Sequence, residues 1–247
     1  MNIQLRKSEE RGTADHGWLK TYHTFSFAFY YDPNFEEFGC LRVINEDRVT
    51  PGKGFGTHSH RAYNIFSYIV DGELTHQDSM GNKETIKSGS VQFTCAGTGI
   101  SHSEYNFHKS KTCHFIQIWV KPIKSDVKPY YKTVEYSDEQ KKGKLCEIVT
   151  SDEKLEKESI LMNANARVFV TLLEKDQKVD HVIQKGRKVY VHLIQREDSS
   201  ISLNSEVILK AGDGVFITPK NEEKITLTFK GESDSRNEVL IFDVLDE

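Results

Sequence analysis

Short segments rich in β-branched and aromatic residues alternate with turn residues along most of this chain, and helical periodicity is scarce. Segments of this kind lie at 39–44, 64–70, 73–77, 91–94, 114–120, 166–173, 189–195, 206–209, 214–217, 224–229 and 239–244. Strands at such regular spacing favour an all-β sandwich or barrel over alternating α/β units. We therefore predict an all-β protein.

The order of these segments repeats along the chain. VYVHLIQ in the second half mirrors NIFSYIVDG in the first, and KAGDGVFITP mirrors KSGSVQFTCAG. The stretch from Lys121 to Lys144 contains two prolines and many charges, which is typical of a boundary. We expect two barrels related by duplication: an N-terminal domain over 1–122, a linker over 123–144 and a C-terminal domain over 145–247.

Two short clusters of metal-ligand residues lie in the first half, His58-Ser59-His60 and His102-Ser103-Glu104. Side chains alternate along a strand, so residues i and i+2 of each cluster point to one face. Three imidazoles and one carboxylate that converge in a barrel would bind a transition metal and leave positions open. A lone His-x-His pair also fits a solvated strand face, since ten histidines in 247 residues produce roughly 0.4 such pairs by chance.

The second half lacks this pattern. At the place of His58-Ser59-His60 it carries Val179-Asp180-His181, and no histidine follows Ile217-Thr218-Pro219. We expect His181 and His192 to be surface or partly packed residues, because a metal site needs several convergent donors. The C-terminal domain is therefore predicted to be without metal ligands.

The glycines around these clusters add a family resemblance. The spacing of Gly52, His58, His60, Gly72, Gly89, Gly97, His102 and Asn106 resembles the two motif halves of a cupin barrel. The segments THSHR, DGELTHQDSMGN and AGTGISHSEYN resemble the pirin family, including its bacterial members with quercetin 2,3-dioxygenase activity, and ERGTADHGWLKTYHTFSFAFYYDPNFEEFGCLRVINEDRV is similar to that family's opening. The resemblance covers residues 1–120 closely and implies a bicupin, two tandem double-stranded β-helix barrels.

The proposed ligands His58, His60, His102 and Glu104 suit one divalent transition metal. Imidazole binds Fe, Cu, Ni and Zn, and a carboxylate adds affinity for Mn and Fe(II). Fe(II) is the expected ion, with Mn, Ni, Cu, Co and Zn as alternatives. Glu104 is also the candidate catalytic base for a substrate hydroxyl, although a plain ligand role is the simpler interpretation.

Apolar residues near the site have two interpretations. Phe55, Phe66, Phe93, Ile116 and Ile118 are candidates to line a pocket above the metal, and ordinary core packing explains each of them as well.

The sequence departs from the family pattern at Ser59, where the family usually has proline, and at Asn64, where it usually has glutamate. Loss of that carboxylate removes a negative charge near the imidazoles, which affects catalysis more than metal binding.

Three functions remain open at this point. The first is a metal-dependent dioxygenase that opens an oxygenated aromatic ring such as that of a flavonol, so its partner is a small aromatic substrate. The second is a non-catalytic regulator of the pirin type, whose metal responds to redox state and alters a surface that binds protein partners. The third is a structural cupin whose metal only holds the barrel together. A substrate-sized opening over the metal would favour the first.

Composition excludes several other classes. The formal net charge of −4 and the lack of a basic patch give no support for direct nucleic-acid binding. The N-terminal MNIQLRKSEER carries no apolar signal region, and apolar runs such as 115–120 are far too short to span a membrane. Four widely spaced cysteines predict free thiols in a reducing compartment. The expected location is cytoplasmic, with the nucleus as an alternative.

Overall fold

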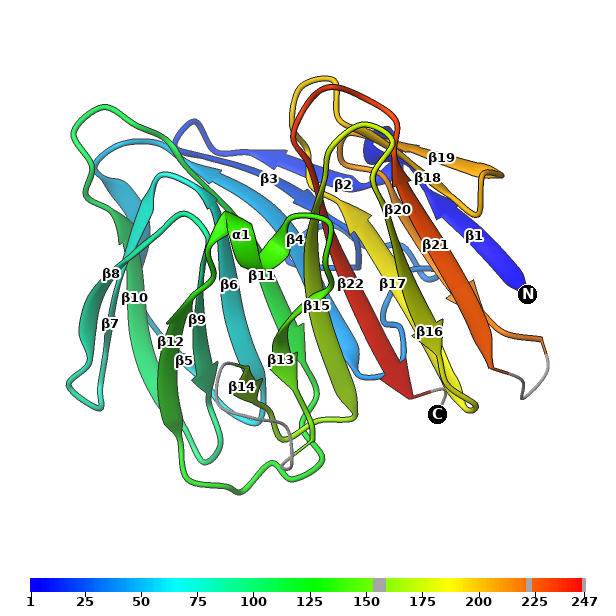
Figure 1. The fold of residues 1–247 in the computed structure, drawn as a ribbon. Coiled ribbons are helices and arrows are strands. Elements are labelled where there is room, and N and C mark those ends of the chain that lie inside the picture. Colours follow the sequence, from blue (N-terminus) through cyan, green and yellow to red (C-terminus); the bar gives the residue numbers. More distant parts are fainter. Residues whose placement is uncertain (153–158, 221–223, 246–247) are drawn as a thin grey trace. The chain divides into compact units, whose positions relative to one another are not determined.

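The computed structural model describes residues 1–152, 159–220 and 224–245 and divides the chain into two compact units (Figure 1). The first barrel comprises residues 12–136 and 160–165, and the second barrel comprises residues 1–11 together with the described parts of 137–159 and 166–247. Antiparallel strands form both units, which confirms the all-β prediction.

The first barrel is built from two sheets. One has the order β12-β9-β6-β11-β4-β3-β2 and the other has the order β5-β10-β7-β8. Their bounds are β2 Gly12–Asp15, β3 Leu19–His23, β4 Leu41–Val49, β5 Lys53–His60, β6 Asn64–Asp71, β7 Glu73–Asp78, β8 Lys83–Lys87, β9 Ser90–Cys95, β10 Ile100–Asn106, β11 Cys113–Val120 and β12 Tyr130–Glu135, and the short β14 (Ile160–Leu161) belongs to the same unit.

Apolar residues fill one part of this barrel. Leu19, Val49, Ile69, Leu74, Ile86, Cys113 and Phe115 form a buried cluster, against which Trp18 and Phe55 pack. The tight turn between β6 and β7 depends on Gly72, whose φ of +77° is a left-handed conformation that other residues adopt at a cost. The turn lies where the sequence pattern placed it, between two strand segments.

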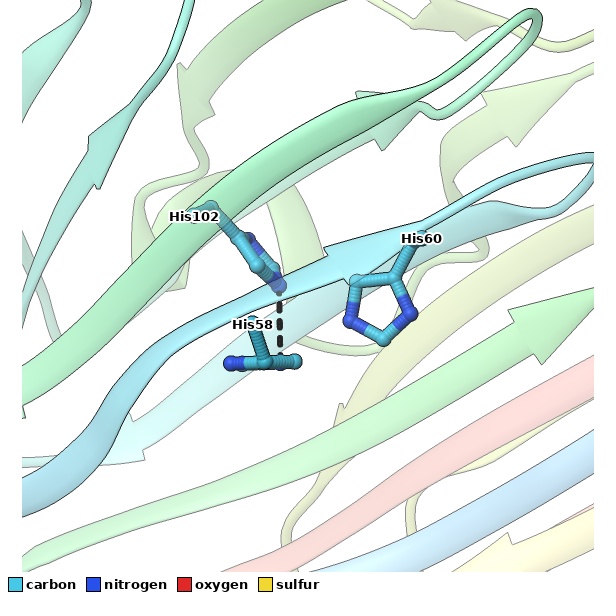
Figure 2. A group of neighbouring side chains, drawn as sticks. All are labelled: His58, His60 and His102. Atoms are coloured by element: carbon cyan, nitrogen blue, oxygen red, sulfur yellow. Dashed lines mark hydrogen bonds between the residues drawn. The ribbon is translucent and has the colours of Figure 1, made fainter.

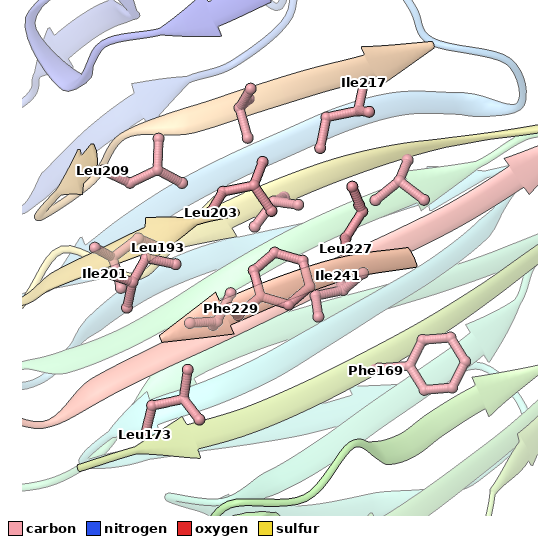
Figure 3. Close-up of a cluster of buried hydrophobic side chains, with 14 of the residues drawn as sticks. Phe169, Leu173, Leu193, Ile201, Leu203, Leu209, Ile217, Leu227, Phe229 and Ile241 are labelled. Atoms are coloured by element: carbon pink, nitrogen blue, oxygen red, sulfur yellow. The ribbon is translucent and has the colours of Figure 1, made fainter. Parts of the chain in front are cut away.

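The second barrel also has two sheets. One contains the order β1-β20-β17-β22-β15-β13, and the other has the order β16-β21-β18-β19. The bounds are β1 Asn2–Arg6, the 3-10 helix η1 Ser8–Glu10, α1 Asp138–Lys141, β13 Cys146–Thr150, β15 Ala166–Leu173, β16 Lys178–Ile183, β17 Arg187–Leu193, β18 Ser200–Leu203, β19 Val207–Lys210, β20 Gly214–Thr218, β21 Ile225–Gly231 and β22 Asn237–Leu245. Apolar side chains from both sheets fill its interior; most are aliphatic, and Phe169 and Phe229 are aromatic (Figure 3).

The compact units differ from the predicted domains in two places. Strand β1 pairs with β20 in register from Asn2 with Thr218 to Arg6 with Gly214, so residues 1–11 belong to the second barrel. The predicted linker over 123–144 is not a plain connection, because β12 extends the first barrel by pairing with β9 and α1 begins the second barrel. Both differences arise from strand pairing between distant residues, which local composition does not reveal.

Candidate metal centre

Strand pairing brings the two ligand clusters together. Strands β10 and β5 are antiparallel neighbours, and His102 is the direct partner of His58. Burial along β10 alternates, so that His102 and Glu104 both point inward, and each is 1% exposed. Between them the register shifts by a bulge, which sets Glu104 opposite Phe55.

Strand β5 approaches β10 closely at Gly54. A Cβ atom at this position would lie 2.2 Å from the backbone oxygen of Glu104, so glycine is required there. The glycine-rich sequence before the first histidine pair therefore has a packing reason.

Figure 2 shows the three imidazole rings of His58, His60 and His102 turned toward one another, with ring centroids 4.6 to 4.8 Å apart. The Nε2 atoms of His102 and His58 are 3.2 Å apart. Two nitrogens bound to one ion at about 2.0–2.1 Å reach this separation at an angle of roughly 100°. The Nδ1 of His58 lies 2.8 Å from the backbone oxygen of Gly56, so with the proton on Nδ1 its Nε2 is left as an acceptor.

The imidazoles resist protonation. Burial lowers the pKa of His102 to about 3, with further lowering by the neighbouring His58 and His60. Burial and the proximity of His58 lower the pKa of His60 to about 4. Both rings are therefore neutral at physiological pH, which is the form that binds a metal.

Glu104 lies beside this group and not in its centre. Ligand atoms of His58, His60 and His102 all lie within 4.8 Å of one another, whereas Glu104 meets that spacing with His76 and His102. The amide of Gln117 donates to its Oε2 over 3.3 Å, and its Oε1 is buried with no hydrogen-bond partner among the described residues. Burial and the charge of Asp47 raise the pKa of Glu104 to about 7, against a smaller opposite effect of Ser67.

A cavity of about 770 Å³ opens beside the imidazoles. His58, His60 and Glu104 all lie in its wall. Aromatic side chains form much of the rest, namely Trp18, Phe27, Phe29, Tyr30, Phe55 and Trp119. The ring of Trp119 meets that of His60 edge-on at 4.8 Å, so the aromatic wall reaches the histidines directly. Ligand pockets in proteins span roughly 300–1,000 Å³, so the cavity can hold a small organic molecule.

Comparison with known proteins gives concordant matches over the whole chain. The family model for pirin matches residues 4–120, and the family model for a quercetinase C-terminal cupin domain matches residues 148–244. Quercetin 2,3-dioxygenase from Escherichia coli K12 is 39% identical over 242 residues, which cover 98% of each protein. The chain belongs to the pirin family. This membership also confirms the predicted bicupin architecture.

Solved structures of pirins agree with the fold. The crystal structure of YhhW from E. coli matches with a TM-score of 0.88 and 37% identity, over 98% of this chain and 97% of that one. The structure of YhhW in complex with nickel(II) matches with a TM-score of 0.87 and 36% identity, over 99% of both chains. A pirin-like protein from Caulobacter vibrioides is 36% identical over 92% of this chain and 94% of its own length. These relatives are bacterial, so they lend no support to the nuclear alternative.

The residues of this pirin fit a divalent metal. The rings of the three histidines are turned toward one another, and the unpartnered Oε1 of Glu104 is a buried acceptor that a cation would satisfy. The donor set of imidazoles and carboxylate matches first-row ions, in agreement with the nickel complex of YhhW.

The histidines of the second barrel are engaged elsewhere. His181 is buried, not at the surface, with its Nε2 2.8 Å from Asp243, which also pairs with Arg187. His192 is fully buried, and its Nδ1 lies 3.3 Å from the hydroxyl of Tyr190. In the described part of the chain, both groups of potential metal donors lie in the first barrel.

Sequence reasoning missed a second pair of functional candidates on β7. His76 is buried beside His102 with ring centroids 5.2 Å apart, and its Nε2 lies 3.0 Å from Asp78. Asp78 is held in turn by the side chain and backbone of Asn82. The signal was present, because His76-Gln77-Asp78 has the same i, i+2 spacing as the two clusters that were recognised. In a pair of this kind the carboxylate fixes the orientation of its histidine, and His76 is itself a potential metal donor together with His102 and Glu104.

The structure distinguishes the two interpretations of the apolar residues near the site. Of the five pocket candidates Phe55 lies in the cavity wall, whereas the core-packing interpretation holds for Phe66, Phe93, Ile116 and Ile118, which are fully buried. The apolar pattern of the sequence cannot distinguish core packing of these four residues from a place in a pocket wall.

Asn64 lies apart from the cavity wall. Its side chain is fully buried and its amide donates to the backbone oxygen of Asn163 over 3.2 Å. The asparagine therefore has a structural contact of its own.

The remaining sequence predictions concern the cysteines and membrane-spanning segments. Cys40, Cys95, Cys113 and Cys146 are free thiols. Among the described residues, no helix combines the length and the apolar character needed to cross a membrane.

Proposed function

We propose that this pirin is a metal-dependent dioxygenase that oxidises a flavonol or a similar hydroxylated aromatic compound, a quercetin 2,3-dioxygenase type of activity. One observation carries the proposal: the imidazoles of His58, His60 and His102 are turned toward one another, and two of them, His58 and His60, lie in the wall of a cavity of about 770 Å³ that is lined by aromatic rings. The name of the E. coli relative, quercetin 2,3-dioxygenase, supports it. A structural metal or a purely regulatory one would not need a substrate-sized space beside its ligands.

The proposed ligands are His58, His60, His102 and Glu104. They would hold one divalent transition metal, Fe(II) by preference, and the nickel(II) complex of YhhW supports a divalent ion in this family. When bound, the ion supplies a Lewis-acidic centre with open positions for oxygen ligands. Glu104 lines the same cavity as His58 and His60, and its carboxylate lies within 4.8 Å of the ligand atoms of His76 and His102, which supports its inclusion as a ligand.

The aromatic walls orient the substrate. Trp18 and Phe55 meet edge-on with centroids 5.2 Å apart, and Phe27 and Trp119 do so at 5.7 Å. Planar rings stack on such surfaces, so a flat aromatic substrate fits between them with one edge toward the histidines. The same walls exclude water, which strengthens the electrostatic contacts of any oxygen atom held at the histidines.

A proton must leave the substrate hydroxyl before it binds as an anion. Glu104 is the proposed acceptor of that proton, in addition to its ligand role, because burial raises its pKa to about 7 and so raises its basicity. Gln117 donates to Oε2 of Glu104 and holds the carboxyl group in place, which leaves Oε1 available.

Oxygen consumption by protein of known metal content tests this function. The protein is purified anaerobically, loaded with Fe, Mn, Ni, Cu or Co in turn, and mixed with quercetin in an oxygen electrode. We expect uptake in at least one metal form, and loss of that uptake in His58→Ala, because this ligand faces both the metal position and the cavity. His181→Ala is the control in the second barrel. No oxygen uptake in any metal form would refute the dioxygenase and favour the regulator that binds protein partners.

A further inference from the structure

A row of polar side chains crosses the interior of the first barrel beside the aromatic walls. Thr21 and His23 on β3 are the direct cross-strand partners of Asp47 and Asn45 on β4, and Asn45 is in turn opposite Gln117 on β11. All five side chains lie in the cavity wall and are buried. Residues two apart on a strand share a face, so the row presents one polar surface to the cavity. We call these five residues the polar row.

Most of the polar row has partners within the protein. The Nδ1 of His23 lies 2.8 Å from Oδ1 of Asn45, and Gln117 donates to Glu104. Thr21 and Asp47 are the exceptions. Both residues are 3% exposed, yet neither Oγ1 of Thr21 nor Oδ1 of Asp47 has a hydrogen-bond partner among the described residues.

An unsatisfied buried carboxylate oxygen is costly, so its retention at a cavity wall indicates a ligand. An apolar residue would suit a buried position on this strand, as the buried Val43 and Val49 show. Burial, with the nearby charge of Glu46, raises the pKa of Asp47 to about 7 although the hydroxyl of Thr21 acts in the opposite direction. One oxygen of the carboxyl group, Oδ1, is thus buried at the cavity wall without a protein donor among the described residues.

We propose that the polar row is a second recognition site of the cavity, in which Asp47 accepts a hydrogen bond from a hydroxyl group of the substrate other than the one that meets the histidines. This inference rests on the proposed function, because it concerns the same substrate. It narrows the substrate class to planar aromatics with at least two separate hydroxyl positions. The His23–Asn45 pair fixes the neighbouring part of the wall, and the aromatic rings hold the body of the molecule.

The binding energy should depend on the second hydroxyl. A hydrogen bond to a charged group changes affinity by roughly 10- to 100-fold, and a ligand that lacks the hydroxyl would leave Asp47 unsatisfied. The preference for the hydroxylated ligand therefore belongs to Asp47 and not to the metal ligands.

Binding can be measured without turnover. Quercetin is compared with 3-hydroxyflavone, which keeps the adjacent hydroxyl and carbonyl groups but lacks the other hydroxyls. Titrations are made under nitrogen with metal-loaded protein at pH 8. The two tryptophans of the chain, Trp18 and Trp119, both lie in the cavity wall, so their fluorescence reports occupancy, and calorimetry supplies independent dissociation constants.

In the wild type we expect quercetin to bind more tightly than 3-hydroxyflavone. Asp47→Ala should weaken quercetin binding roughly 10- to 100-fold and leave 3-hydroxyflavone unchanged, and Asp47→Asn should act in the same direction with a smaller effect. Asp15→Asn is the matched control, because it removes an exposed carboxylate from the same barrel. Thermal melts show that each variant is folded.

Equal weakening of both ligands, or no weakening of either, would overturn the inference. Its failure is distinguishable from that of the proposed function. A protein that discriminates the ligands through Asp47 but consumes no oxygen keeps the recognition site and loses the dioxygenase. A protein that consumes oxygen but shows no Asp47-dependent discrimination keeps the dioxygenase and loses the recognition site.

Discussion

Replacement of Asp47 by asparagine should stabilise the first barrel at alkaline pH. Burial raises the pKa of this carboxyl group from 3.8 to about 7 in the folded protein. The folded state therefore binds the proton more tightly than the unfolded chain does, and the free energy of unfolding falls as the pH rises from about 4 to about 7. Asparagine has no charge to bury at any pH, so the free energy of unfolding of the variant does not fall for this reason as the pH rises.

The magnitude follows from the two pKa values. With 1.36 kcal/mol for each pKa unit, the penalty on the wild type is about 1.7 kcal/mol at pH 5 and about 4 kcal/mol at pH 8. Between these two pH values the stability of Asp47→Asn should therefore gain roughly 2–3 kcal/mol relative to the wild type. Loss of the Asp47 charge also lowers the pKa of Glu104, which reduces the cost of burying that carboxylate at pH 8 and therefore acts in the same direction.

Urea denaturation of the metal-free protein at pH 5 and pH 8 measures this difference. Both tryptophans, Trp18 and Trp119, belong to the first barrel, so their fluorescence follows the unfolding of that unit. Asp15→Asn should show the pH dependence of the wild type. If the stability difference between Asp47→Asn and the wild type is the same at pH 5 and pH 8, Asp47 is not a buried carboxylate held at a cost, and the reasoning fails.

Three further predictions concern the metal centre and its surroundings. His60→Ala should lose most of its bound metal by elemental analysis while His181→Ala keeps it, and a stoichiometry near two per chain in the wild type would contradict a single site. His76→Ala and Asp78→Asn should each weaken metal affinity about 10- to 100-fold in chelator competition, and unchanged affinity would show that the pair takes no part in the metal site. Asn64→Glu should lower the free energy of unfolding, measured with urea, by roughly 1–3 kcal/mol, because a carboxylate at this position would face a backbone oxygen. Oxygen uptake should change little, and a rise in uptake would show that this position does tune the metal.

The local chemistry of the site was predictable from the sequence. Alternation along a strand is a property of the chain itself, so His58 and His60 had to share a face, as did His102 and Glu104. The same alternation predicted the strands around them, and the glycine pattern carried the family resemblance. The pair His76 and Asp78 obeyed the same rule and was recognisable in principle.

The composition of the cavity was decided by tertiary structure. Asp47 is an ordinary residue of a strand with charges of both signs in the sequence, and its register with Thr21 and its burial exist only once β3, β4 and β11 have paired. The transfer of residues 1–11 to the second barrel likewise depends on pairing with β20, about 200 residues away. Periodicity determines which side chains share a face, whereas pairing between distant strands determines what that face meets, because no local preference of the chain encodes the partner.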